Sequence, residues 1–173
     1  MGARVAATGA SGFDVDGKGP GTALELLIIS PTATAAGTAN LGLTVQSLTD
    51  ATYNTIGTPN GVGGTVTIIS NGSTPTPTIA PTQTPVPSGP GTLIIDPPDQ
   101  YVLLGGYGTV RLMLNTGSQL IAAYGVTLSY PPSLLSITSS SILAGKDGFV
   151  SAVGATTAGS VVISGFEIRS APM

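Results

Sequence analysis

The chain has 173 residues, no cysteine and no histidine, and only 8% of its residues are charged, for a net charge of −3. Without cysteine or histidine, the sequence excludes disulfides, zinc sites of the usual kind and a Ser-His-Asp triad. The small acidic charge excludes an electrostatic footprint for nucleic acid. The longest apolar run, 24–29, is too short for membrane insertion. Hydrophobic residues make up 41% of the chain, so a buried core is possible.

Residues 1–70 predict β-structure, because Gly, Thr, Val and Ile dominate and helical periodicity is hard to find. Strands are expected at 23–34, 39–48 and 64–69. In the second of these, Leu41, Leu43 and Val45 alternate with Gly or polar residues, which is the period of a half-buried strand. The sequence Thr-Pro-Asn-Gly at 58–61 predicts a turn before the third strand.

Residues 71–91 form a Thr/Pro-rich linker, in which Thr and Pro alternate. Proline lacks a backbone donor, so we expect an extended, polyproline-II-like segment without a sheet ladder. Such tracts are typical of extracellular multi-module proteins and are often glycosylated, although a plain linker is the simpler interpretation. The glycosylation candidates are Asn71, in an Asn-Gly-Ser sequon, and Thr74, Thr76 and Thr78. We therefore expect an extracellular or cell-surface location.

After the linker, further strands are expected at 91–96, 107–115, 122–130, 134–139 and 160–168. Val110, Leu112 and Leu114 share one face of the second of these, and Tyr124, Val126 and Leu128 share one face of the third. Proline pairs at 97–98 and 131–132 are expected to end strands, because they remove ladder donors. Short strands at this spacing predict an all-β fold, an antiparallel β-sandwich.

A short repeat links the two ends of the chain. The sequence Ser-Gly-Phe-Asp-Val at 11–15 matches Ser-Gly-Phe-Glu-Ile at 164–168. The spacing corresponds to about one sandwich plus one linker, which favours a true repeat. The chain then resembles one period of a tandem array that is opened in mid-domain.

Two runs after the linker carry a family resemblance: GGYGTVRL at 105–112 and YGVTLSYPPSLL at 124–135. With them, residues 91–143 resemble the first half of a cohesin-like module, the sandwich of cellulosomal scaffoldins and related surface proteins. Pro131 stands where that family usually has Asp. Residues 21–69 resemble the second half, through ALELLI at 23–28, TAAGTANL at 34–41 and GTVTI at 64–68.

The resemblance implies a jelly-roll or cohesin-like sandwich whose halves appear in inverted order. Residues 1–70 would be the second half of one module, 71–91 the linker, and 92–173 the first half of the next module. Each half exposes an apolar sheet face and unpaired strand edges, so the halves must meet. They can meet within one chain or between chains, and we favour pairing between chains, because only there does the duplicated strand have a use.

The acidic residues suggest no chemistry by themselves. Asp14 and Asp16 begin a segment similar to a calcium loop, but Lys18 stands at a ligand position, so a turn is favoured. Asp96 and Asp99 flank two prolines and are interpreted as solvated turn acids. No base stands ready to activate a serine or threonine. The sequence therefore predicts no enzyme activity, catalytic residue, cofactor or metal.

The leading hypothesis is a non-catalytic extracellular structural module that assembles head-to-tail with other copies of itself, as a fibre, sheath or surface scaffold. The alternative is a cohesin-like receptor for a dockerin-type module in a scaffold for polysaccharide degradation. Neither hypothesis involves nucleic acid or membrane insertion. The candidate partner-binding residues lie on two expected strands: Leu41, Leu43, Val45, Tyr124, Val126 and Leu128.

Overall fold

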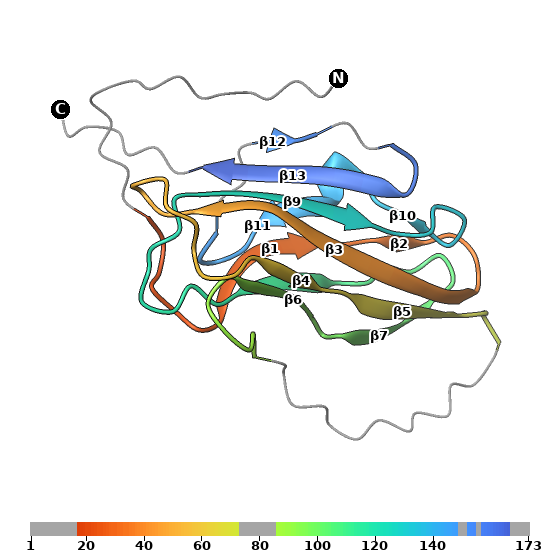
Figure 1. Ribbon diagram of the computed structural model, residues 1–173. Coiled ribbons are helices and arrows are strands. Elements are labelled where there is room, and N and C mark those ends of the chain that lie inside the picture. Colours follow the sequence, from red (N-terminus) through yellow and green to blue (C-terminus); the bar gives the residue numbers. More distant parts are fainter. Residues whose placement is uncertain (1–16, 73–85, 149–151, 155–156, 167–173) are drawn as a thin grey trace.

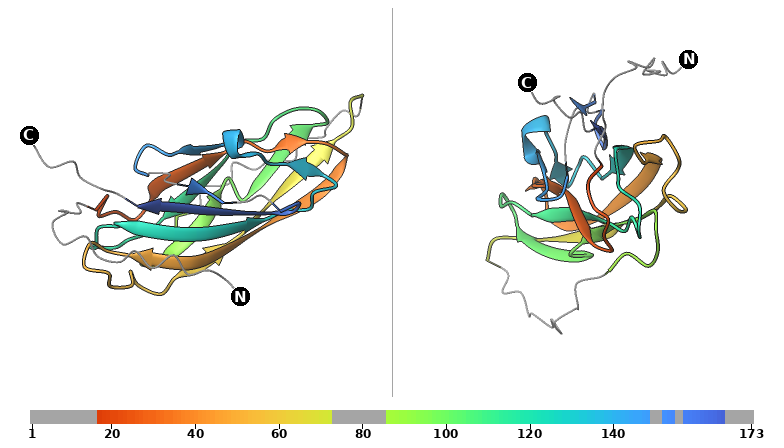
Figure 2. Two further views of the ribbon diagram at one scale, coloured as in Figure 1. Left: turned by 90° about the horizontal axis from the view of Figure 1, so that it is seen from above. Right: turned by 90° about the vertical axis from the view of Figure 1, so that its left-hand side faces the viewer.

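The structure is a computed structural model that describes residues 17–72, 86–148, 152–154 and 157–166. Two β-sheets pack face to face in it (Figures 1 and 2). Eight of the ten described strand pairs are antiparallel, and two are parallel. The predicted all-β sandwich is therefore confirmed.

The first sheet has the strand order β11-β1-β8-β6-β4. In that order the strands are Ile142–Ala144, Leu24–Ile29, Val110–Leu114, Thr92–Asp96 and Asn60–Val62. β1 pairs antiparallel with β8 and with β11, and its register shifts between Glu25 and Leu27. This β-bulge accompanies the burial of two consecutive residues, Leu26 and Leu27, which a regular strand would place on opposite faces.

The second sheet has the strand order β12-β13-β9-β3-β5-β7. In that order the strands are Ala152–Val153, Ser160–Phe166, Ala123–Ser129, Gly37–Thr49, Gly64–Ile69 and Asp99–Leu103. β3 has 13 residues and pairs antiparallel with β5 along its first part and with β9 along its second. A minor sheet joins β2 (Thr32–Ala33) to β10 (Leu135–Ser136), and a short 3-10 helix spans Ser139–Ser141.

Two stretches of chain cross from one sheet to the other along the same side of the sandwich. The first passes from β4 to β5 at Gly63, and the second passes from β6 to β7 at Pro97 and Pro98. They run parallel, since β4 pairs with β6 and β5 pairs with β7. Where they cross, the backbone N–H of Thr65 donates to the carbonyl of Pro98 over 2.6 Å. This double crossing connects the two sheets by backbone on that side.

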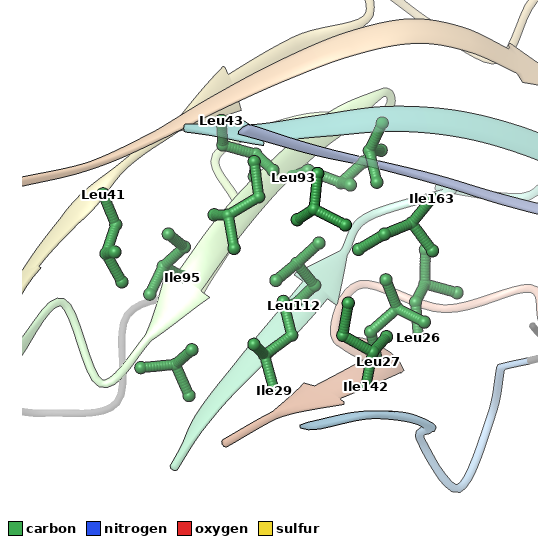
Figure 3. Packing of buried hydrophobic residues seen from close by; sticks show 14 of the residues in the cluster. Leu26, Leu27, Ile29, Leu41, Leu43, Leu93, Ile95, Leu112, Ile142 and Ile163 are labelled. Atoms are coloured by element: carbon green, nitrogen blue, oxygen red, sulfur yellow. The ribbon is translucent and has the colours of Figure 1, made fainter. Parts of the chain in front are cut away.

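The core lies between the sheets and draws on residues from both sides of the linker (Figure 3). Leu27 of β1 is paired in register with Leu112 of β8, and both are fully buried. The nine apolar residues expected to share a core do so: Leu41, Leu43, Val45, Val66, Ile68, Leu112, Leu114, Val126 and Leu128, with Val45 partly buried. That prediction is confirmed.

The preference for pairing between chains is wrong for this structure. The segments before and after the linker each supply strands to both sheets of one chain, and strands from the two segments pair directly in each sheet. The physical reason is that the linker allows the two segments to meet at high effective concentration, so their apolar faces leave water without a second molecule. β13 lies between β9 and β12 and is not at an open edge.

Several strand boundaries differ from the expectation. The strand expected at 23–34 is two strands, β1 and β2, on either side of Pro31, which has no donor for a ladder. The Asn-Gly turn signal at 60–61 belongs instead to β4. β6 ends directly before Pro97, as expected, but an unexpected strand, β7, begins directly after Pro98. In both places, the Gly or Pro residues that predict a turn lie next to the point where the chain crosses from one sheet to the other.

Candidate interaction face

The most extended surface feature is the outward side of the four central strands of the second sheet, β13, β9, β3 and β5. Along β3, buried Leu41 and Leu43 alternate with outward-facing Asn40 and Thr44. We define the polar face by these outward residues: Thr38, Asn40, Thr44, Gln46, Thr65, Thr67, Thr127, Ser129 and Val162. The side-chain amide of Gln46 donates to the hydroxyl of Thr127 across two strands, over 2.7 Å.

The second sheet is almost free of charge. Its six strands contain one Asp, Glu, Lys or Arg residue, Asp99 at the start of edge strand β7. The described ion pairs lie by the first sheet instead. Arg111 Nε lies 3.2 Å from Glu25 Oε2, and Lys146 Nζ lies 3.2 Å from Asp147 Oδ2. Since burying an unpaired charge is costly, a neutral face is easier to cover with another protein than a charged one.

Exposed apolar side chains border the polar face at both edges. On the β7 side, Tyr101 is 58% exposed and Leu103 is 53% exposed, and Tyr107 follows in the next loop. On the opposite side, Phe166 at the end of β13 is 51% exposed. The outward face shared by Tyr101 and Leu103 was not predicted, because residues 99–103 were not expected to form a strand, whereas Phe166 lies in the strand expected at 160–168.

The six candidate partner-binding residues are interior residues. Leu41, Leu43, Tyr124, Val126 and Leu128 are buried, and Val45 is partly buried against them. They do lie close together, because β3 and β9 are paired along seven positions. A partner that approaches the folded chain would contact the outward residues of the same strands, such as Thr44 and Thr127.

One of the four glycosylation candidates lies among the described residues. Asn71 is exposed in a turn after β5, so its side chain is accessible. Thr74, Thr76 and Thr78 lie outside the described residues. The end of the linker packs on the sandwich: Asn115 donates from Nδ2 to the carbonyl of Pro87 over 3.1 Å, and Thr58 donates to the carbonyl of Pro90.

The acids occupy unlike environments. Asp96 is buried at the end of β6, which differs from the expected solvated turn acid, and this burial raises the pKa of its carboxyl. Asp99 is exposed and accepts a hydrogen bond from the hydroxyl of Thr65. Asp50 accepts hydrogen bonds from Asn54 and Thr52, which lower its pKa. Asp14 and Asp16 lie outside the described residues.

Within the described ranges, no group of three or more acidic residues is arranged to hold a metal ion. Among the same residues, no helix is long and apolar enough to cross a membrane. Comparisons with family models, with curated proteins and with solved structures each found no match for this chain.

Proposed function

We propose that this chain is a non-catalytic extracellular structural module that associates with other copies of itself through its second sheet. The observation that carries the proposal is the polar face: a broad sheet surface without charged residues, made largely of Thr, Ser, Asn and Gln side chains. Two such faces can be placed together without burying an unpaired charge, and their hydroxyl and amide groups can donate to each other.

The apolar rims add to this support. An interface gains most of its affinity from a few large side chains that are removed from water. Tyr101 and Leu103 along one edge and Phe166 along the other offer such side chains beside the polar face. The Thr/Pro linker and the exposed Asn71 sequon support the extracellular part of the proposal.

The experiment that tests the proposal measures self-association of the purified chain by sedimentation and by direct imaging. Replacing Thr44 and Thr127 together with glutamate places like charges on the polar face. We expect this double variant to weaken self-association by about tenfold or more, because each copy would bury charges without partners. The matched control is Leu143→Glu, since Leu143 is 60% exposed on β11 of the first sheet. If neither the chain nor its variants associate, the proposal is wrong.

A cohesin-like receptor is the second candidate function. It is favoured by one observation: the two strands expected to bind a partner, β3 and β9, lie side by side and share the polar face. A dockerin-type module titrated against the chain should then bind with an affinity that Thr44→Glu reduces. Association with copies of the chain but not with the dockerin module would separate the first candidate from the second.

A further inference from the structure

The repeat noted in the sequence falls on a strand of the sandwich. Ser164, Gly165 and Phe166 form the end of β13, where Phe166 is paired with Ala123 of β9. We call the position that β13 fills beside β9 the β13 slot. The N-terminal copy of the motif, 11–13, carries the same three residues, Ser-Gly-Phe. The chain therefore contains two segments that match one slot.

The N-terminal segment is attached next to the β13 slot. Lys18 and Ile121 exchange two backbone hydrogen bonds of 2.8 Å in an antiparallel bridge. Ile121 lies two residues before Ala123, the residue that Phe166 faces. Figures 1 and 2 show the first described residues, in red, near the end of β13. The chain before Lys18 thus starts from the end of the slot at which β13 finishes.

The connection is long enough for the N-terminal copy to reach the slot. If Phe13 took the place of Phe166, residues 14–17 would join it to Lys18. On the partner strand only Ala122 separates the two paired positions, a distance of roughly 7 Å at 3.3 Å per residue. Four connecting residues span up to about 17 Å over their five steps, so the loop closes without strain.

The two copies differ in how well they fill the slot. In β13, Val161 and Ile163 point inward and are fully buried. The aligned residues of the N-terminal copy are Thr8 and Ala10, which are more polar or smaller. The C-terminal segment therefore binds more tightly in the slot, because it removes more apolar surface from water. The N-terminal segment is the weaker competitor.

We propose that the β13 slot is a strand-exchange site, at which β13 of one copy of this chain pairs with β9 of the next copy. Such an exchange joins the copies head-to-tail in a row. The first copy in the row receives no β13 from a neighbour, so its slot is left open. Residues 7–13 of the first copy fill that slot, which covers β9 and releases β13 of that copy for its neighbour. This inference rests on the proposed self-association and names the contact that makes it.

The chain has no cysteine, so each engineered disulfide reports one strand pair. Val162 of β13 and Thr127 of β9 are paired in register, and both lie on the polar face. The single variants Val162→Cys and Thr127→Cys are unfolded, mixed, refolded together and oxidised. We expect a disulfide-linked dimer of the two variants in several-fold excess over the control mixture of Val162→Cys with Thr44→Cys. Thr44 is more exposed than Thr127 but lies on β3, one strand further from the slot.

The N-terminal segment is tested within one chain. In the double variant Gly9→Cys and Thr127→Cys, an intrachain disulfide forms only when this segment fills the slot. Adding Thr8→Val and Ala10→Ile should raise the yield of that disulfide by about tenfold or more, since the inward positions then match β13 more closely. The matched control adds Ala7→Ile and Ser11→Val, which place similar apolar groups at outward positions.

The outcomes separate this inference from the proposed function. If the unmodified chain self-associates but neither disulfide exceeds its control, strand exchange is overturned and the structural module stands. If both disulfides form as expected while the unmodified chain stays monomeric at all concentrations, the exchange site stands and the proposed function is overturned.

Discussion

Leu112 lies where the two segments of the chain meet, so its truncation tests the fold most directly. It is fully buried on β8, paired with Leu27 of β1 on one side and with Ile95 of β6 on the other. Replacing a buried leucine with alanine lowers the free energy of unfolding by about 3–5 kcal/mol, because apolar burial is lost and a cavity remains. For a domain of this size, each kcal/mol lowers Tm by about 2–4 °C, so Leu112→Ala should melt roughly 6–20 °C below the parent.

The assay is urea unfolding followed by tyrosine fluorescence or circular dichroism, at several protein concentrations. The control is Leu143→Ala, the same truncation at an exposed position of the same sheet, which should change stability by less than about 0.5 kcal/mol. Because the core closes within one chain, the midpoint should not depend on concentration below the range in which copies of the chain associate. A midpoint that rises with concentration in this dilute range, or a loss of stability below about 1 kcal/mol for Leu112→Ala, would refute the argument.

Two further predictions concern the crossing between the sheets and the buried acid. Gly63→Ala should unfold at lower urea concentration than Gly89→Ala. A Cβ at Gly63 would lie 2.1 Å from the carbonyl oxygen of Leu41, whereas one at Gly89 meets nothing within 4 Å. Equal midpoints would contradict the close approach of the crossing at Gly63 to β3. Burial raises the pKa of Asp96, so the folded chain favours the protonated acid and loses stability as pH rises from below the ordinary carboxyl pKa through the raised one. The free energy of unfolding of Asp96→Asn, measured by urea titration, should therefore increase relative to that of the parent as pH rises from 3 to 7. If the difference between the two stays constant with pH, burial does not raise the pKa of Asp96.

The fold could be predicted well wherever one face of a strand is buried. β5 has the expected bounds, and β3 and β9 differ from the expectation by one or two residues at each end. In these strands apolar residues alternate with small or polar ones because one face is buried and the other is not. This pattern can be recognised without knowing which distant strands pair with them. β4 and β7 could not be found in this way, because they adjoin the crossing at Gly63 and Pro98, and only the folded chain shows where the crossing occurs.

The candidate partner-binding residues come from the two strands to which the cohesin-like resemblance assigns partner binding. They are the apolar residues of the alternation in β3 and β9. The structure uses the face that they share for its own core, because the second half of the sandwich is already in the same chain. The exposed rim residues Tyr101 and Leu103 depend on the position of β7 at the sheet edge, which is a tertiary fact.

The arrangement around β9 also determines how the module would respond to force. Lys18 is bonded to Ile121, and Phe166 faces Ala123, so tension applied between residues 18 and 166 acts at one end of β9. The hydrogen bonds between β13 and β9 would then break one after another from that end, as in a zipper, and not all together in shear. The contact between β13 and β9 would therefore be the first to open under such tension, while the other strand pairs of the two sheets stay intact.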